Sequence, residues 1–577
     1  MKPSVKKSEQ SRILSEVALG NIPPDMVITN GSVFNVFTRE FIRGQSIWIK
    51  DGAIAYVGPD LDPPGGERRV VIDAKGMVVL PGLIEGHTHI SNRYGIEEFV
   101  RYVIPTGVTT VVTETIELAT VVGREGIEYL VRGLEGQPIR FYYTVAPLCG
   151  LTSSEEINAP ANEDLLPLLQ SPRCLGMGEI YWSNIFLKEL QGERVRELAS
   201  IAVEQGKRVE GHTAGASGRK LQAYTCFGPS SCHEPITEDE VLERLRLGYW
   251  VMIREGSIRR ELAGVRGIFD KGIDFRRLVL STDGVDPEDF LNEGYLDASL
   301  RRALALGISP GLLYQMVTLN VAEHFRLDHL LGSLSPGRMA DAVIIPSPEE
   351  FTPQWVICHG KVIFRDGQNM VEPKRVFFPD SMFATVKVHG YSVPPLPARG
   401  KVRAMELVSR LVTREDIIDL GDPEGSKDVI MALALNRSGS EEGFVGFLKG
   451  FGLQRGAYGS TMCWDTPDII VVGCDTRSME TVVERLREIG GGGVYAIGEE
   501  VVAEFPAPLC GLASLKPMKE VGKEVKRLNQ CLMENGARWE KPILTVDTLG
   551  SPAIPHLRIT HRGYVRLRDR EVLRVQA

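Results

Sequence analysis

Alternating apolar and polar positions occur in two separate blocks that flank a long middle region. The first, residues 26–79, reads as short β-like runs broken by Asx-Gly pairs at 30–31 and 51–52, which are typical of hairpin turns. The same pattern of short β-like runs and turns returns at 340–367. Neither block has enough strands to bury a core alone, so we expect the two to join in one β-sandwich. Apolar residues at helical spacing over 9–19 predict a short amphipathic helix ahead of the first block.

Between the blocks, short apolar runs alternate with helical patterns. This alternation over about 250 residues predicts a (β/α)8 TIM barrel, whose functional site lies at the C-terminal strand ends. The sixth strand is poorly marked and is expected between Lys220 and Cys232. The predicted strands are Val108–Val112, Arg140–Val145, Leu175–Glu179, Arg208–His212, Tyr249–Ile253 and Leu278–Thr282, and the predicted helices are Ile127–Leu134, Arg194–Glu204, Glu238–Leu247, Asp297–Leu306 and Pro310–Val317.

A Pro-rich connection at 393–400 precedes a further α+β unit, in which METVVERLREIG reads as a helix between the strands DIIVVGCD and GGVYAIG. The glycines at 490–493 follow this helix instead of opening one, so we interpret them as a helix cap and turn, not a phosphate loop. The expected fold class is therefore α/β, with an N-terminal helix and the first part of the sandwich at 1–79, the barrel at 80–335, the second part of the sandwich at 336–392, and a C-terminal α+β domain at 401–577.

The composition narrows the class of protein. The chain has 577 residues, of which 43% are hydrophobic and 24% charged, as in soluble globular proteins. A net charge of -9 disfavours a nucleic-acid partner. No apolar run is long enough to span a membrane, and the N-terminus has no apolar core typical of a secretory signal. The nine cysteines form no C-x-x-C pair, so we expect reduced thiols and a cytoplasmic protein.

Chemistry-bearing side chains gather at the ends of the predicted barrel strands. Each alone has a plain structural interpretation, as a satisfied core histidine or a capping carboxylate. Together, four imidazoles and two carboxylates without a thiolate favour two divalent ions, Mn²⁺, Fe²⁺ or Zn²⁺. Such a pair generates hydroxide from a shared water, and a nearby carboxylate can relay its proton. We expect hydrolysis at a planar carbon bonded to nitrogen. The six residues are His87, His89, Glu179, His212, His233 and Asp283.

Longer motifs carry a resemblance. The segments PGLIEGHTHI, GMGEI, VEGHTAGASG, CHEPIT and STDGVDPEDFLNEGYLD, with GFVGFLKGFGLQRGAYGS and AIPHLRIT near the C-terminus, resemble the amidohydrolase superfamily and, within it, the bacterial and archaeal adenine deaminases. The resemblance implies a urease-like composite β-domain around a binuclear barrel that often works with Mn²⁺ or Fe²⁺. It implies that the six residues are the metal ligands, with Glu179 as the bridge and Asp283 as the proton shuttle. The implied reaction, in purine metabolism, is deamination of adenine to hypoxanthine and ammonia, or of a related amino-substituted heterocycle, by a metal-bound hydroxide.

The chain departs from the family pattern at positions expected near the substrate. Residues 91–93 read Ser-Asn-Arg where the family has Glu-Ser-Ser, and Gly284 replaces a second Asp. Residues 464–468 read Trp-Asp-Thr-Pro-Asp in place of His-Asp-Ser-His-Asn, and 436–439 replace a basic stretch. Because of these changes, the sequence indicates the type of reaction more firmly than the identity of the substrate's ring. The residues expected to contact it are Ser91, Arg93, Arg254, Glu255 and Asp465, although Arg254 and Glu255 also fit a salt-bridged strand end.

Two alternatives stay open. A cyclic amide or ureide hydrolase would use the same centre, but such enzymes more often bridge their metals with a carboxylated lysine, where this chain has Glu179. A non-catalytic binding or regulatory protein would have little physical reason to keep six ligands. The expected partner is a small heterocyclic substrate, with no nucleic acid and no membrane, and we expect a homo-oligomer, a dimer or higher.

Overall fold

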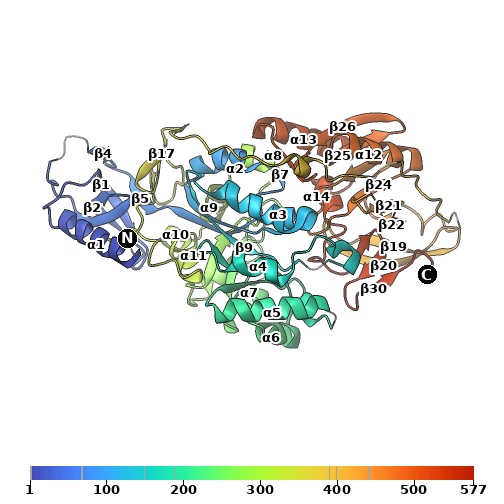
Figure 1. The fold of residues 1–577 in the computed structure, drawn as a ribbon, viewed down its shortest axis with the longest axis horizontal. Helices are drawn as coiled ribbons and strands as arrows, with labels where there is room; N and C mark the ends of the chain where they lie inside the picture. Colours follow the sequence, from blue (N-terminus) through green and yellow to red (C-terminus); the bar gives the residue numbers. More distant parts are fainter. Residues whose placement is uncertain are drawn as a thin grey trace.

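The computed structural model describes residues 3–65, 69–148, 150–188, 190–388, 390–397, 399–439 and 442–577. Figure 1 shows three regions along the long axis of the molecule. An N-terminal β-rich region lies at one end, a strand-and-helix region fills the middle, and a C-terminal region forms the other end. No helix in the described ranges is both long and apolar enough to cross a membrane.

The N-terminal region is a single nine-stranded sheet that uses both β blocks of the sequence. Its two parts meet where β5 pairs antiparallel with β15, with Leu80 opposite Val343. The helix α1 (Pro3–Ala18) covers one side by packing Leu14 and Val17 on Trp48. The strand order is β18 (Gln368–Asn369), β17 (Lys361–Arg365), β16 (Trp355–Cys358), β15 (Ala342–Ile345), β5 (Val78–Pro81), β1 (Met26–Asn35), β2 (Glu40–Lys50) and β3 (Ala53–Pro59), with β4 (Val70–Asp73) paired to β1.

The middle region confirms the predicted barrel. Its strands pair in parallel in two runs, from β6 to β11 and from β12 to β14. Two backbone hydrogen bonds join the runs: Ser230 donates to Val209 at 2.9 Å, and Asp283 donates to His87 at 3.1 Å. The barrel strands are β6 (Leu83–Thr88), β8 (Val108–Thr113), β9 (Arg140–Val145), β10 (Cys174–Tyr181), β11 (Arg208–His212), β12 (Ser231–Cys232), β13 (Trp250–Arg254) and β14 (Leu278–Ser281).

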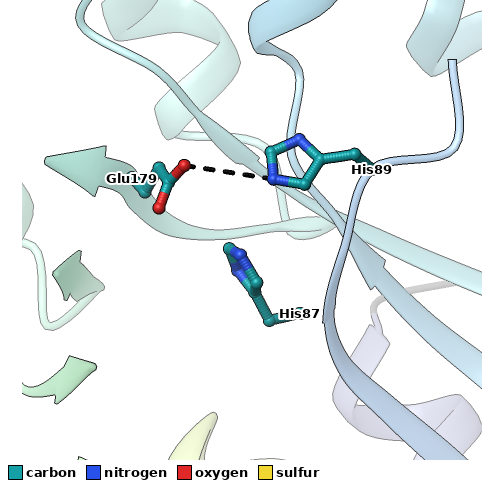
Figure 2. Close-up of side chains that lie close together, drawn as sticks. All are labelled: His87, His89 and Glu179. Atoms are coloured by element: carbon teal, nitrogen blue, oxygen red, sulfur yellow. Dashed lines mark ion pairs between the residues drawn. The ribbon is translucent and has the colours of Figure 1, made fainter. Parts of the chain in front are cut away.

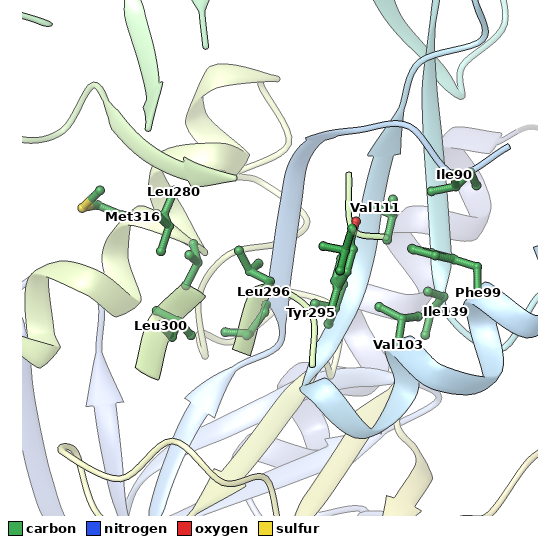
Figure 3. Packing of buried hydrophobic residues seen from close by; sticks show 14 of the residues in the cluster. Ile90, Phe99, Val103, Val111, Ile139, Leu280, Tyr295, Leu296, Leu300 and Met316 are labelled. Carbon is green, nitrogen blue, oxygen red and sulfur yellow. The ribbon is translucent and has the colours of Figure 1, made fainter. Parts of the chain in front are cut away.

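The sixth strand, β12, is only two residues long and follows a helix, α6, which explains its weak signal in the sequence. Helices pack around the barrel, and Figure 3 shows Phe99 and Val103 of α2 and Leu300 of α9 beside the strands that carry Val111 and Leu280. The helices are α2 (Ile96–Val103), α3 (Ile116–Leu134), α4 (Asn162–Leu169), α5 (Leu190–Glu204), α6 (Gly218–Thr225), α7 (Glu238–Arg246), α8 (Pro287–Asn292), α9 (Leu296–Ala305), α10 (Pro310–Met316) and α11 (Leu319–His324). Short 3-10 turns are η1 (Ile104–Thr106), η2 (Ser153–Glu156), η3 (Asn184–Phe186), η4 (Arg266–Asp270) and η5 (Asp380–Phe383).

The C-terminal region is built on an eight-stranded sheet. Gly490 and Gly491, with φ of 75° and 111°, turn the chain from the end of α12 into β25, as the sequence predicted. The sheet order is β20 (Thr413–Asp419), β19 (Lys401–Leu407), β22 (Gly443–Lys449), β21 (Val429–Leu435), β24 (Ile469–Gly473), β23 (Ala457–Ser460), β25 (Gly492–Ile497) and β26 (Glu500–Pro506). The other elements are α12 (Thr476–Glu488), α13 (Met518–Glu534), α14 (Pro542–Asp547) and the antiparallel strands β28 (Leu557–Thr560), β29 (Gly563–Arg566) and β30 (Glu571–Leu573).

The C-terminal region docks on the barrel of the same chain. The strand β27 (Ala513–Ser514) pairs in parallel with β7 (Arg93–Tyr94), which lies in the loop after the first barrel strand. The docking therefore takes place at the C-terminal face of the barrel, where the expected site lies.

Candidate metal centre

The six strand-end residues come together at the C-terminal face of the barrel, and all six are buried. Three overlapping groups have possible ligand atoms within 4.8 Å of one another. They are His87, His89 and Glu179; His87, His233 and Asp283; and Glu179, His212 and His233. Figure 2 shows Glu179 on one strand facing the imidazole of His89 from across the centre.

Glu179 lies in the middle of the cluster. Its Oε1 is 3.9 Å from Nε2 of His89, while its Oε2 is 2.9 Å from Nδ1 of His212 and 3.1 Å from Nε2 of His233. Burial opposes ionisation, but His212 and His233 outweigh it and hold the pKa of this carboxyl well below its ordinary value. One oxygen thus faces each half of the cluster, as a bridging carboxylate requires.

Asp283 reaches the cluster because its backbone leaves the strand direction just after β14. Its φ is 61°, in the left-handed region that Asp adopts more readily than most residues. Its Oδ1 lies 3.2 Å from Nε2 of His87 and 3.4 Å from Nε2 of His89. Burial alone would raise the pKa of Asp283, but the two histidines and the Arg254 charge keep it well below its usual range.

The donor chemistry fits divalent ions. Imidazoles and carboxylates are good ligands for Mn²⁺, Fe²⁺ and Zn²⁺. His87 Nε2 is buried with no hydrogen-bond partner among the described residues, so it is free to act as a ligand. Burial would lower the pKa of His87, but Asp283 and Glu114 raise it to about 10.

Two carboxylates that the sequence reasoning missed support the histidine pair. Glu117 pairs with Nδ1 of His89, and Glu114 Oε1 lies 3.4 Å from Nδ1 of His87. Thr144 donates to Glu114 at 2.6 Å. A carboxylate behind a ligand imidazole fixes its ring orientation and raises its basicity. Glu114 comes directly after the strand Val108–Thr113, so the strand-end rule that found the six ligands also applied to it.

Arg254, at the end of β13, connects the cluster to its surroundings. Its Nη1 donates to Asp283 Oδ2 at 3.0 Å and also to Glu234. Burial alone would raise the pKa of Glu234, but the charges of Arg254 and the neighbouring histidines outweigh it and bring the pKa to about 2. Arg254 thus lies beside the cluster and is at the same time a salt-bridged strand end.

A cavity opens over the cluster, with about 550 Å³ of space when its open mouth is included. The barrel and the C-terminal region both line it. Trp464 forms one wall, with its ring 5.2 Å from that of His89 in an edge-on arrangement. His212 Nε2 lies 3.2 Å from the carbonyl oxygen of Ala553. The C-terminal walls are Leu411, Trp464, Asp465, Thr548, Ser551 and Ala553–Pro555.

The structure separates the expected substrate-contacting residues. Arg254 and Asp465 line the main cavity. Arg93 lies at a smaller side cavity, where it pairs with Asp286 and Asp547. Ser91 and Glu255 are not among the residues that line either cavity.

The reason in each case is a local partner. Ser91 donates a hydrogen bond to Glu117 at 3.1 Å. Its hydroxyl therefore points toward the carboxylate that pairs with His89, and away from the cavity. Glu255 points the opposite way from Arg254, as neighbours in an extended chain do. Its carboxylate accepts hydrogen bonds from Leu262 N at 3.0 Å and from Arg302 Nε at 2.8 Å.

Comparison with known proteins agrees with this geometry. Residues 78–363 match the amidohydrolase family, and residues 407–571 match the adenine deaminase C-terminal domain. An adenine deaminase of Clostridium botulinum (strain 657 / Type Ba4) is 32% identical over 581 aligned positions, which cover 96% of each chain. One of Moorella thermoacetica is 32% identical over 583 positions, covering 97% of this chain and 96% of that protein. A solved D-hydantoinase from Thermus sp. is 16% identical, with a TM-score of 0.45, over 60% of this chain and 97% of its own.

The barrel and its buried cluster of histidines and carboxylates define a metal-dependent hydrolase of the amidohydrolase class, which acts on C–N bonds. Both the barrel and the C-terminal region match along nearly their whole length. The chain belongs to the adenine deaminase family.

Proposed function

We propose that this protein deaminates adenine to hypoxanthine and ammonia, or acts in the same way on a closely related amino-substituted heterocycle. The observation that carries the proposal is the position of Asp283, between the imidazoles of His87 and His89 on one side and Arg254 on the other. Deamination needs a carboxylate that stays ionised at the reacting carbon and can move a proton. The relatives named adenine deaminase support adenine as the substrate.

The six clustered residues would hold two divalent ions, with Glu179 shared by both. The ions proposed are Mn²⁺ or Fe²⁺, and Zn²⁺ is also possible. When bound, such ions lower the pKa of a water they share and make it a nucleophile at neutral pH. Glu114 and Glu117 hold the ring orientations of His87 and His89.

Asp283 moves the proton. Its Oδ2 accepts a hydrogen bond from Arg254, so Oδ1 is the oxygen that faces the reacting centre. Oδ1 takes a proton from the attacking water and delivers it to the exocyclic nitrogen, which leaves as ammonia. Oxygen from water remains on the ring carbon, which gives hypoxanthine from adenine.

The C-terminal region positions the ring. Trp464 offers a flat apolar wall, and Asp465 lies half-buried beside it, where it accepts a hydrogen bond from Ser551 at 2.7 Å. Burial, and then the charge of Glu179, raises the pKa of Asp465 to about 6. In its protonated form Asp465 can donate a hydrogen bond to a ring nitrogen and so make the ring carbon more electrophilic.

The cavity does not favour the cyclic amide or ureide hydrolase. Among the described residues that line the main cavity there is no lysine that could carry a bridging carboxylate group, and Glu179 occupies the central position. We therefore propose the deaminase alone.

Further properties of the protein belong to the same proposal. Its family and composition support a cytoplasmic homo-oligomer, a dimer or higher, without nucleic-acid or membrane partners. We propose domain limits at 1–79, 80–335, 336–392 and 401–577, because the nine-stranded sheet draws on the first and third segments, the barrel on the second and the eight-stranded sheet on the fourth.

The test is release of ammonia and hypoxanthine from adenine by purified protein supplied with Mn²⁺. We expect both products in equal amounts, and we expect Asp283→Asn to lose them while the fold is kept. A wild-type protein with full metal content that releases no ammonia from adenine or from other aminopurines, aminopyrimidines and aminopterins overturns the proposal.

A further inference from the structure

Asn92, in the loop after the first barrel strand, is a buried amide without partners. Its side chain is only 8% exposed, yet neither Oδ1 nor Nδ2 has a hydrogen-bond partner among the described residues. Buried polar groups are nearly always bonded, and leaving both ends of an amide unpaired destabilises the folded state. Such a group points to a ligand that completes its hydrogen bonds.

Asn92 lines the side cavity, which is small and partly open to solvent. This cavity adjoins the main one, because His89, Ile258 and Trp464 line both. A ring lying over the metal centre along Trp464 therefore extends from the main cavity toward Asn92.

The charges around Asn92 exclude an anionic ligand. Among the described residues that line the side cavity, Arg93 carries a guanidinium whose two Nη atoms already pair with Asp286 and Asp547, while its Nε has no partner. The two carboxylates offset the charge of Arg93, so the cavity offers no net positive charge to a carboxylate or phosphate. The ligand it suits is neutral and carries a donor beside an acceptor, because a carboxamide offers one of each.

We propose that Asn92 determines substrate specificity by reading the N3/N9–H edge of a free purine base. This proposal rests on the deaminase function proposed above. With the exocyclic amine at Asp283, the remaining edge of adenine that places a donor next to an acceptor is N9–H with N3. Asn92 Nδ2 donates to N3 and N9–H donates to Asn92 Oδ1, as amides pair with other purine edges.

The pairing selects against substituted bases. A sugar or methyl group on N9 removes the N–H donor and adds bulk to a small cavity. A site built to hydrogen-bond a substrate group discriminates strongly against analogues that lack it, since its own polar atoms are then left unpaired. Free adenine is therefore preferred over its N9-substituted forms.

The experiment compares kcat/KM for adenine, 3-deazaadenine and 9-methyladenine in the wild type, Asn92→Leu and Asn92→Asp. We expect the wild type to prefer adenine over both analogues. Asn92→Leu should lower kcat/KM for adenine about 10- to 100-fold, by loss of two hydrogen bonds, and change the analogues much less. Asn92→Asp keeps the acceptor and loses the donor, so it should still reject 9-methyladenine and accept 3-deazaadenine about as well as adenine.

Asn158→Leu is the matched control. Asn158 Nδ2 donates to the Val121 carbonyl at 2.7 Å, away from both cavities, so this variant should lose stability and keep the wild-type preference among the three bases. Asn92→Leu should instead keep the metal content and a melting temperature at least as high as that of the wild type, because no protein partner is lost. Equal preference in the wild type and in Asn92→Leu overturns the role of Asn92. Absence of ammonia release from adenine by the wild type overturns the deaminase function itself.

Discussion

Arg254 and Asp283 form a buried ion pair at the edge of the metal centre, with 3.0 Å between Nη1 and Oδ2. The pair leaves Oδ1 of the aspartate turned toward His87 and His89. A single guanidinium thus selects which carboxylate oxygen is available for proton transfer.

Replacing Arg254 should therefore impair catalysis more than metal binding. We expect Arg254→Met to lower kcat by about 100-fold or more, because an oriented charge next to the reacting groups is lost. Steady-state kinetics with metal analysis of the same sample measures this. Arg260→Met is the control, since Arg260 forms a partly exposed pair with Glu293. A variant with wild-type kcat would show that Arg254 only stabilises the strand end.

Glu117 should control metal affinity through His89. Glu117→Gln leaves the side chain in place but removes the charge behind the imidazole, and we expect metal affinity to fall about 10- to 100-fold. Competition with a fluorescent chelator measures the affinity directly, without reference to activity. Glu128→Gln, on the exposed face of α3, is the matched control. Equal affinities in the two variants would contradict the supporting role.

Metal removal should abolish the reaction reversibly. Dialysis against a chelator is expected to stop ammonia release and to lower the melting temperature, because the buried carboxylates lose compensating charge. Added Mn²⁺ should restore both, with two ions per chain by elemental analysis. Well below one ion per chain as purified, with no recovery on adding Mn²⁺, would favour a non-catalytic protein.

Asp547 should hold the C-terminal region on the barrel. Its Oδ2 accepts a hydrogen bond from Arg93 Nη2 at 2.7 Å, and both side chains are buried. Asp547→Ala leaves Arg93 with one of its two carboxylate partners, and breaking such buried pairs destabilises proteins by about 3–5 kcal/mol. Thermal unfolding and limited proteolysis between the two regions measure the loss. Asp569→Ala, which breaks an exposed pair with Arg566, is the control and should have little effect.

Glu155 lies at the same interface, where it accepts a hydrogen bond from Thr466 at 2.8 Å, and it makes this interface sensitive to pH. Burial, and then the charge of Asp468, raises its pKa from 4.5 to about 8. Between these values the folded protein binds more protons than the unfolded chain, so this group's contribution to stability falls as pH rises toward and through 8. In the Glu155→Gln variant the side chain stays neutral at every pH, so the variant does not lose this stability as the pH rises.

The melting temperature of Glu155→Gln relative to the wild type should therefore be higher at pH 9 than at pH 6. Differential scanning fluorimetry across this range, with Glu163→Gln on the barrel helix α4 as the control, tests the sign. A difference between variant and wild type that does not change with pH would contradict it.

Much of the barrel and of the buried cluster at its strand ends was predictable from the sequence, because both depend on local patterns. Strands such as Arg140–Val145 and Arg208–His212 have the predicted bounds. His212 and Asp283 were predictable as site residues because the ends of parallel strands meet at one face of a barrel.

The substrate side was decided by tertiary structure. From the sequence, Ser91, Arg93 and Glu255 were equal candidates for substrate contact. Each lies close in sequence to a predicted metal ligand or to Arg254, but this closeness does not say where the side chain points. Partners far along the chain settle it: Arg302 binds Glu255, and Asp547, 454 residues from Arg93, binds that arginine. The chemistry of the centre follows from residue types at strand ends, whereas the shape and polarity of the pocket follow from contacts between distant segments. Only the folded chain brings Asn92 and Trp464 to one cavity beside His89.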